Sequence, residues 1–141
     1  MNVDHSECIF CKIARGEIPC AKIYETQNIL SFLDISPSAP GHALIIPKAH
    51  FPTVLEVDPA LGPDLITAFG KVGRAVMAAT GATGMNVMLN CNESAGQVVF
   101  HTHWHVIPRI EGDGLRLWPG GKYDSMQEMS ALAEKIRALV A

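Results

Sequence analysis

Three of the six histidines occupy alternate positions in one short segment, His101-Thr102-His103-Trp104-His105. Alternate side chains of a β-strand point to the same side, so the spacing predicts a row of three imidazoles on one strand face. The outer two rings would lie about 13 Å apart, too far for both to bind one zinc ion through bonds of about 2 Å. The row therefore predicts at least two different chemical roles.

A cysteine pair forms the second group with recognisable chemistry, Cys8-Ile9-Phe10-Cys11. With one histidine from the row and one isolated histidine, the pair would complete a tetrahedral zinc shell of two sulfurs and two nitrogens. The alternatives are two buried thiols or a redox pair, although the helix that follows a thioredoxin-like pair would be cut short here at Gly16. A shell closed by four protein ligands leaves no position for water, so such a metal ion would stabilise the fold.

The first half of the chain predicts a run of short strands. Strand-like segments of four or five residues, bounded by turn residues, occur at 22–25, 29–33 and 43–47. The loop at 36–41 contains Pro37 and Pro40, which make it stiff and irregular. A long helix then follows from the cap Asp58-Pro59 to Gly81, because apolar residues recur at helical spacing between them.

The second half predicts two further strands and a final helix. The strands are expected at 85–89 and 100–107, on either side of a turn-rich loop. Ser125 and Glu128 form a capping box for a helix over 125–140, with apolar residues on one face at Met129, Leu132, Ile136 and Leu139. We therefore predict an α+β fold with an antiparallel sheet, and one domain over residues 1–141.

Composition bounds the function. The chain has 141 residues, of which 48% are hydrophobic and 18% are charged, so it predicts one globular domain and excludes disorder. A net charge of −3 argues against a general electrostatic grip on nucleic acid. No apolar span is long enough for a membrane helix, and residues 1–7 lack a signal sequence, so we expect a cytoplasmic protein with no membrane partner. Free thiols, and not disulfides, are expected in that compartment.

The histidine row and its apolar successors resemble the signature of the histidine-triad (HIT) family of nucleotide hydrolases and transferases. The resemblance covers residues 8 to about 123, and the Cys-x-x-Cys pair is similar to that of the zinc-bearing bacterial-type branch. It rests also on Gly16-Glu17-Ile18-Pro19, Phe32-Leu33-Asp34-Ile35-Ser36-Pro37, Gly41-His42-Ala43-Leu44-Ile45-Ile46-Pro47-Lys48 and Gly96-Gln97. The resemblance implies a five-stranded antiparallel sheet, one long central helix, and a homodimer formed through that helix.

The resemblance also implies a role for each matching residue. His103 would be the nucleophile that attacks the α-phosphorus, with its other ring nitrogen held by a backbone carbonyl near the third histidine. The further catalytic positions would be His105, His42 and Gln97. The backbone donors of Gly96 and Gln97 would face the phosphate, and Asp34 would bind the ribose hydroxyls. The nucleotide-binding set is Phe10, Ile13, Ile18, Phe32, Asp34, Ile35, Asn90, Gly96, Gln97, Val98, His103 and His105, and the ligands of a structural zinc are Cys8, Cys11, His50 and His101.

One departure from the family pattern concerns the leaving group. Many members have Ser or Thr where this chain has Val98, which has no hydroxyl to bond the phosphate or supply a proton. The leading hypothesis is hydrolysis of purine nucleoside 5′-phosphoramidates or dinucleoside polyphosphates, through a nucleotidyl-histidine, to a nucleoside monophosphate. The alternatives are a nucleotide sensor with weakened catalysis, and a zinc hydrolase that uses His101 and His103 at an open metal site.

Overall fold

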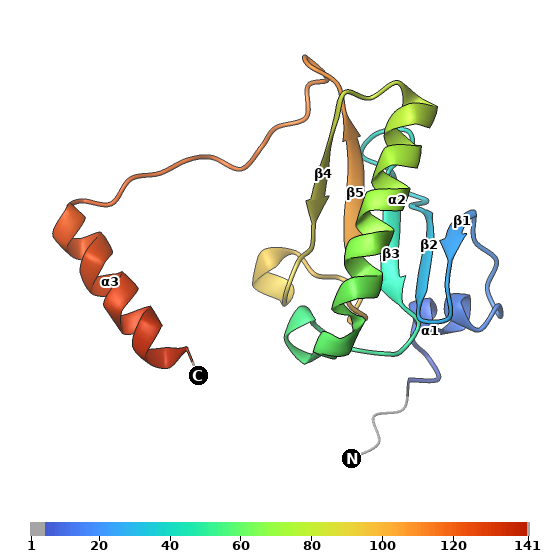
Figure 1. The fold of residues 1–141 in the computed structure, drawn as a ribbon, viewed down its shortest axis with the longest axis horizontal. Coiled ribbons are helices and arrows are strands. Elements are labelled where there is room, and N and C mark those ends of the chain that lie inside the picture. Colours follow the sequence, from blue (N-terminus) through green and yellow to red (C-terminus); the bar gives the residue numbers. More distant parts are fainter. Residues whose placement is uncertain (1–4, 141) are drawn as a thin grey trace.

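The computed structural model describes residues 5–140 and contains one five-stranded antiparallel sheet in the order β1-β2-β3-β5-β4 (Figure 1). Three helices accompany it. The strands are β1 (Lys22–Glu25), β2 (Ile29–Leu33), β3 (Ala43–Pro47), β4 (Gly84–Met88) and β5 (Trp104–Arg109), and the helices are α1 (Ile9–Ala14), α2 (Gly62–Thr80) and α3 (Met126–Leu139). The predicted α+β fold is confirmed, and the first three strands have the predicted bounds.

Residues 1–4, part of the segment in which we expected no signal sequence, lie outside the described residues. Within 5–140, no helix has both the length and the apolar character that a membrane span requires.

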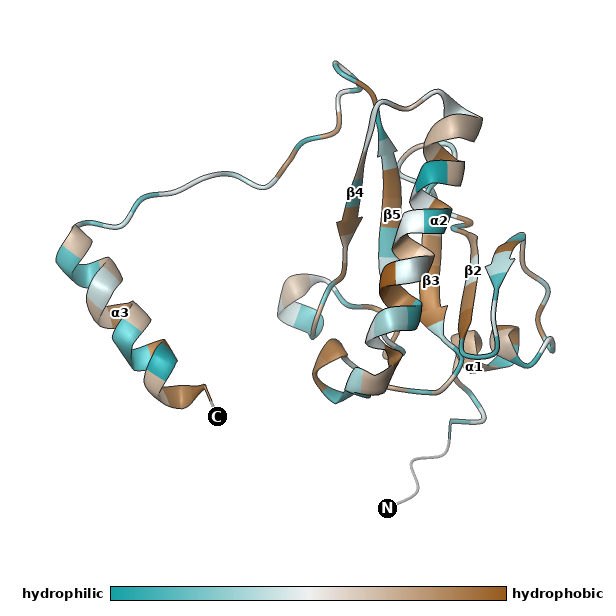
Figure 2. Ribbon diagram, in the orientation of Figure 1, coloured by the Kyte–Doolittle hydropathy of each residue, from teal (hydrophilic) through white to brown (hydrophobic). Residues whose placement is uncertain are grey.

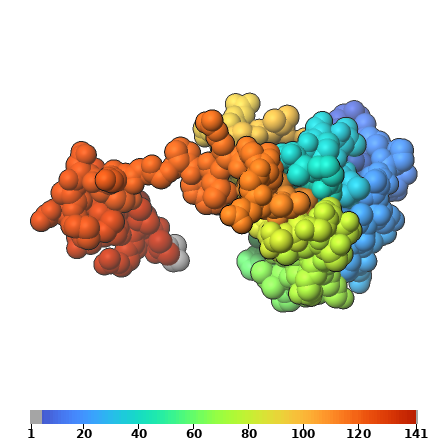
Figure 3. Space-filling model, turned by 90° about the horizontal axis from the view of Figure 1, so that it is seen from above, coloured from blue at the N-terminus to red at the C-terminus, as the bar shows by residue number. Residues whose placement is uncertain are grey.

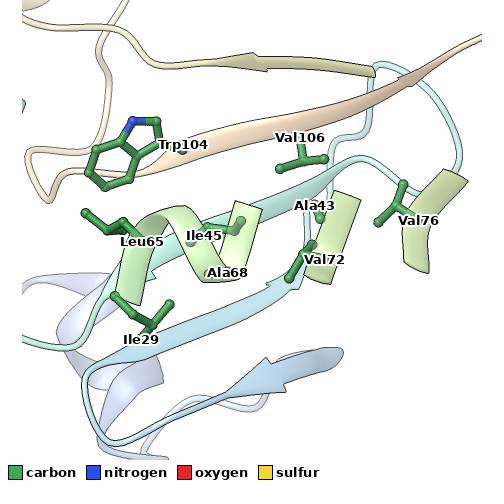
Figure 4. Packing of buried hydrophobic residues seen from close by; sticks show 9 residues of the cluster. All are labelled: Ile29, Ala43, Ile45, Leu65, Ala68, Val72, Val76, Trp104 and Val106. Carbon is green, nitrogen blue, oxygen red and sulfur yellow. The ribbon is translucent and has the colours of Figure 1, made fainter. Parts of the chain in front are cut away.

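Helix α2 covers one face of the sheet. Its inward residues Leu65, Ala68, Val72 and Val76 recur at helical spacing and pack on the strands (Figure 4). Strand side chains that face α2 include the fully buried Ile45. Truncating such a residue to alanine costs about 2–5 kcal/mol of unfolding free energy, so this layer is a main source of stability.

The opposite face of the sheet carries the second core cluster. Because side chains alternate along a strand, the neighbours of the α2-facing residues point to this side, where they pack against Phe10 of α1. The cluster consists of Phe10, Leu30, Phe32, Leu44 and Ile46. His105 also belongs to this face, since it lies between Trp104 and Val106, which both pack on the α2 side. The side of the sheet away from α2 therefore carries His105, one of the predicted site residues.

The long helix starts later than its capping residues predict. Asp58 caps a short 3₁₀ turn, Pro59–Leu61, and the α-helix proper begins at Gly62. Pro63 explains the difference, because it lacks the N–H that a helix running from Pro59 would need at that position. The predicted end is confirmed, with Gly81 in the left-handed conformation (φ +74°).

The prediction that residues 100–107 form one strand is wrong for the first half of that segment. β5 begins only at Trp104, so His101 and His103 precede the strand. The reason is that Thr102 donates both its backbone N–H and its hydroxyl to the carbonyl of Phe51, at 2.7 and 2.8 Å, and no strand pairs with it. The strand predicted at 85–89 is also displaced by one residue.

Helix α3 stands apart from the rest of the chain. Ser125 caps it as predicted, accepting a bond from the N–H of Glu128 at 3.1 Å. An extended segment carries the helix away from the body of the protein, as Figures 1 and 3 show. None of its residues is buried.

Gly41 fixes the end of the proline-containing loop just before His42. Its φ of +92° disfavours any residue with a side chain, and an added Cβ would lie 2.6 Å from Cγ2 of Thr80. The backbone of His42 is held on both sides, because its N–H donates to Ala39 O and its carbonyl accepts from Asp34 N–H, each at 2.9 Å. Gly41 therefore lets α2 and this loop approach closely enough to position His42.

We expect Gly41→Ala to lower the unfolding free energy by about 2–4 kcal/mol, because backbone strain and the clash with Thr80 add. Gly81→Ala is the matched control, since it also has positive φ but meets nothing within 4 Å, and it should cost only about 1 kcal/mol. Thr80→Ser removes the clashing methyl group and should recover part of the Gly41→Ala loss in urea unfolding. Equal losses for both glycines, with no recovery, would contradict the close approach.

Candidate active site and metal centre

Four candidate metal ligands converge at one end of the sheet. The thiol of Cys8 lies 3.5 Å from Nδ1 of His101, and the thiol of Cys11 lies 3.2 Å from Nδ1 of His50 and 3.5 Å from Nδ1 of His101. All four ligand atoms lie within 4.8 Å of one another. Sulfur and nitrogen ligands on a tetrahedral zinc ion are separated by roughly 3.6 Å, given the usual bond lengths. The residues present therefore fit a zinc ion.

His101 is already oriented for such an ion. Its Nε2–H donates to the carbonyl of Pro47 at 2.8 Å, which leaves the lone pair on Nδ1, the nitrogen that faces both thiols. Burial lowers the pKa of His101 to about 4, so the ring is neutral at pH 7. Burial, with Cys8 adding to it, raises the pKa of the Cys11 thiol to about 11, so metal binding must displace that proton.

A further residue completes this cluster. The ring of His5 stacks on that of His50, with centroids 3.8 Å apart and planes 22° apart. An isolated histidine near the start of a chain carries no pattern that predicts such a contact.

The cluster favours a closed metal shell over a redox pair and over an open zinc site. A redox pair needs no imidazoles beside its thiols, whereas each thiol here lies within 3.5 Å of an imidazole nitrogen. An open zinc site built on His101 and His103 needs both rings on one ion, but only His101 turns toward the cluster. A closed four-ligand shell leaves no position for a reacting water molecule.

A cavity of about 730 Å³ lies against the sheet face away from α2. This volume is within the usual range for small-molecule sites. Nine of the predicted nucleotide-binding residues line it: Phe10, Ile13, Ile18, Phe32, Asp34, Ile35, Val98, His103 and His105. Cys20, for which the sequence indicated no role, lines it as well. The lining is mostly apolar, and Asp34 is its one carboxylate.

His103 is held through a backbone carbonyl, though not the one expected. Its Nδ1–H donates to the carbonyl of His101 at 2.7 Å, whereas the resemblance placed that carbonyl near the third histidine. The segment before β5 is irregular, so the chain folds back and brings the carbonyl two residues earlier into reach. Because Nδ1 carries the proton, Nε2 of His103 has a free lone pair at the wall of the cavity.

The opposite arrangement holds for His105. The backbone N–H of Ser38 donates to Nδ1 of His42 at 3.0 Å, so the proton of a neutral His42 ring is on Nε2. That nitrogen lies 2.8 Å from Nδ1 of His105, which accepts the bond. His105 must then carry its own proton on Nε2. The hydrogen bonds from Ser38 through His42 thus make His105 a hydrogen-bond donor toward the cavity.

Burial keeps the His42 and His105 rings neutral. It lowers the pKa of His105 to about 4, with the charges of His103 and His42 adding to the effect, and it lowers the pKa of His42, which Asp34 partly offsets. At pH 7, His105 is therefore a neutral donor and not a cationic acid.

Asp34, His42 and His105 also lie close enough together to hold a metal ion. An ion on Nε2 of His42 would require the ring proton to move to Nδ1, where the N–H of Ser38 already points. The hydrogen bonds thus favour the proton chain over a second metal site.

The loop after β4 does not offer the groups expected of it. The amide of Gln97 is buried and bonds the N–H of Asn92 and the carbonyls of Pro52 and Val99, at 2.7–3.1 Å. The N–H groups of Gly96 and Gln97 donate to Glu93 O and Asn92 O within the loop, and Asn90 donates to Gly96 O. None of Asn90, Gly96 and Gln97 lines the cavity. In this structure the Gln97 side chain holds the loop together, and its predicted catalytic role stays a prediction.

The comparisons with known proteins agree with this geometry. The family description "HIT domain" matches residues 15–112, more than half of the chain. The protein belongs to the HIT family.

Two relatives have names that state an activity. Adenylylsulfatase HINT3 of Arabidopsis thaliana is 46% identical over 110 residues, which are 78% of this chain and 56% of the relative, so this chain spans little more than half of that protein. The adenosine 5′-monophosphoramidase hnt1 of Schizosaccharomyces pombe is 40% identical over 135 residues, 94% of this chain and 98% of that protein.

Two solved structures are similar over nearly the whole chain. A crystallised protein of Streptococcus mutans UA159 superposes with a TM-score of 0.92 and 38% identity, over 100% of this chain and 90% of that one. A zinc-bound histidine-triad protein of Mycobacterium smegmatis superposes with a TM-score of 0.74 and 34% identity, over 94% of this chain and 98% of that one.

The metal centre predicts a specific loss in Cys11→Ser. Purified wild type should contain about one zinc ion per chain, and Cys11→Ser should contain less than about a tenth of that and lose at least about 3 kcal/mol of stability. Cys91→Ser is the matched control, because Cys91 lies outside the cluster, and it should keep its zinc. Elemental analysis and urea unfolding give the two readouts. Full zinc content in Cys11→Ser would refute the ligand set.

The hydrogen bonds predict three ring tautomers, which two-bond ¹H–¹⁵N correlation spectra identify. His42 and His105 should carry their proton on Nε2, and His103 on Nδ1. His105 should stay neutral down to about pH 5, because burial lowers its pKa to about 4. In the unfolded chain, His105 takes up a proton near pH 6.5. The free energy of unfolding should therefore fall as the pH drops from about 6.5 to 4. A proton on Nδ1 of His105 at pH 7 would contradict the proposed hydrogen bonds from Ser38 through His42 to His105.

Proposed function

We propose that this HIT family nucleotide hydrolase cleaves purine nucleoside 5′-phosphoramidates or dinucleoside polyphosphates through a nucleotidyl-histidine on His103. The product would be a nucleoside monophosphate. The observation that carries the proposal is the pair of opposite tautomers at the cavity wall, a free lone pair on His103 beside an N–H on His105. The names of two relatives, an adenylylsulfatase and a monophosphoramidase, support the same bond class.

The cavity wall suits a nucleoside. Phe10 and Phe32 pack edge to face, 5.7 Å apart, and with Ile13 and Ile18 they offer an apolar surface to a flat base. Asp34 lies at the same wall, and its Oδ1 accepts from the N–H of Ser36 at 2.8 Å, which holds the carboxylate in place. A carboxylate so placed can accept the hydrogen bonds of two ribose hydroxyls.

The first chemical step is an attack by Nε2 of His103 on the α-phosphorus. A neutral imidazole with a free lone pair is a good nucleophile at pH 7, and the His101 carbonyl stabilises the positive charge that develops on the ring. The bond to the leaving group breaks as the bond to nitrogen forms. His103 and His105 have ring centroids 5.1 Å apart, so the Nε2–H of His105 can bond a phosphoryl oxygen during this step.

In the second step, water attacks the phosphorus, the P–N bond to Nε2 of His103 breaks, and the proton of the attacking water passes to solvent. His105 serves both steps as a neutral donor, and its low pKa means that it does not supply the proton that the leaving group needs. Val98, which lines the cavity and is 87% exposed, has no hydroxyl to supply it either. We therefore expect leaving groups that are already protonated, or easily protonated by solvent, to be preferred.

Zinc, held by Cys8, Cys11, His50 and His101, would have a structural role. When bound, it would cross-link α1 to the segments that carry His50 and His101. The zinc-bound relative supports the assignment. A reducing, cytoplasmic compartment suits the site, because cysteines bind zinc as thiolates.

The proposal includes a homodimer formed through α2. Ile66, on the outer side of this helix, is 69% exposed. A second copy packed on this helix would cover it.

The chemical proposal is tested by His103→Ala with adenosine 5′-phosphoramidate. We expect turnover to fall by at least about 10³-fold with zinc content unchanged, because the nucleophile is lost while the metal ligands stay. Intact-mass spectra of wild type quenched during turnover should show an added nucleotidyl group, absent from the variant. Turnover within tenfold of wild type in the variant would exclude His103 as nucleophile, and saturable AMP binding by a wild type without turnover would favour a nucleotide sensor.

A further inference from the structure

His5 is a half-buried residue beside the candidate metal centre, and the proposed function does not use it. Its ring stacks on that of His50, with centroids 3.8 Å apart and planes inclined by 22°. Within the described part of the chain, the ligand atoms that converge on one point do not include those of His5. The contact of His5 with the cluster is therefore a ring stack, and not a bond to the same ion.

The two imidazoles of the candidate metal centre are held in different ways. His101 donates its Nε2–H to the carbonyl of Pro47 at 2.8 Å, whereas no group of residues 5–140 bonds Nε2 of His50. A zinc-binding histidine normally has its second nitrogen held by a hydrogen bond, because that bond fixes the tautomer and the direction of the ring. For His50, packing must fix the direction instead.

Two neighbouring rings pack on His50. The ring of His101 meets it edge to face, with centroids 5.0 Å apart, and the ring of His5 lies face to face with it. The stack covers one face of the His50 ring, so it opposes the side-chain rotations that would swing Nδ1 away from the thiol of Cys11, which is 3.2 Å distant. An imidazole that has given its lone pair to a cation is electron-poor, so the electron-rich face of a neighbouring ring should hold it more strongly.

A turn ties His5 to another candidate ligand. The backbone N–H of Cys8 donates to the carbonyl of His5 at 3.1 Å, and the thiol of Cys8 accepts from the N–H of Cys11 at 3.4 Å. The segment that leads into α1 is hydrophilic (Figure 2), so burial of apolar side chains does not hold His5 in place. The stack and the bond to Cys8 hold it, and they link a candidate ligand before α1 with one after β3.

His5 lies on the more exposed side of the candidate metal centre. Cys11 and His101 are buried, whereas Cys8 and His50 are half-buried. Ligand exchange starts at groups that a competing chelator can reach, so loss of a metal ion should begin at the half-buried pair. His5 contacts both members of that pair, one through its ring and the other through its backbone.

We propose that His5 is a positioning residue for zinc, which stacks on His50, holds that ligand toward the metal and slows release of the ion. The inference rests on the structural zinc of the proposed function and extends it to a residue outside the ligand set. Loss of a group that orients a zinc ligand typically costs about 10–100-fold in metal affinity, and loss of this stack should act on the same scale.

Zinc release to an excess of the chelator 4-(2-pyridylazo)resorcinol tests the proposal in the full chain. Release from His5→Ala should be at least about tenfold faster than from wild type, because the His50 ring can then turn away. His5→Phe is the matched variant, since it keeps a flat ring without a nitrogen, and it should release zinc within about threefold of the wild-type rate. Release from His5→Phe as fast as from His5→Ala would mean that a nitrogen of His5 holds the metal. Equal rates in all three proteins would mean that the stack does not hold it, and either result overturns the inference.

A second control separates the ring of His5 from the turn that carries it. Glu7 lies in the same segment, and its carboxylate is 88% exposed and pairs with Lys12 at 3.1 Å. Glu7→Ala should therefore release zinc at the wild-type rate. Release as fast as from His5→Ala would assign the effect to general loosening of the turn and would overturn the role of the ring.

The zinc content of wild type distinguishes this inference from the assignment on which it rests. A purified wild type without zinc would refute the metal centre and the role of His5 together. A wild type with about one zinc ion per chain, whose release His5→Ala leaves unchanged, would refute the role of His5 alone. Neither measurement depends on turnover through His103.

Discussion

The buried imidazole of His101 is the constraint on which the rest of the site depends. Its Nδ1 faces the two thiols, its Nε2–H bonds Pro47 at the end of β3, and its own carbonyl holds Nδ1 of His103. A neutral ring has one proton and one lone pair, so these contacts fit a single tautomer. The ring is fully buried, and any shift of it would move the proposed nucleophile and the candidate metal ligands together.

Backbone groups, and not side chains, divide the work between the two histidines at the cavity. The carbonyl of His101 turns the lone pair of His103 outward, and the N–H of Ser38, through His42, turns the N–H of His105 outward. One ring can therefore attack a phosphorus while its neighbour bonds the charged oxygen on it. Burial strengthens the division, because it keeps His42 and His105 neutral at the pH at which His103 must act.

Much of the fold could be predicted from the sequence because local patterns decide it. The strands at 22–25, 29–33 and 43–47 have clear boundaries, and the cap at Ser125 needs only neighbouring residues. The start of α2 was predicted too early because Pro63 overrides the earlier cap. A strand was wrongly predicted before Trp104 because Thr102 bonds Phe51, which is distant in sequence. The residues of the Cys/His cluster and most of the residues that line the cavity were singled out through the family resemblance. Ser38 acts through its backbone N–H, which no side-chain pattern in the sequence reveals. The hydrogen bonds of the Gln97 amide become apparent only in the folded loop.

The stereochemical course at phosphorus tests the central claim most directly, because it counts displacements without relying on any variant. A substrate with a chiral phosphorothioate at the α-position is hydrolysed in ¹⁸O-water, and the configuration of the product is determined. Two displacements, first by His103 and then by water, predict retention of configuration. Inversion would mean that water attacks the phosphorus directly, and would contradict the nucleotidyl-histidine.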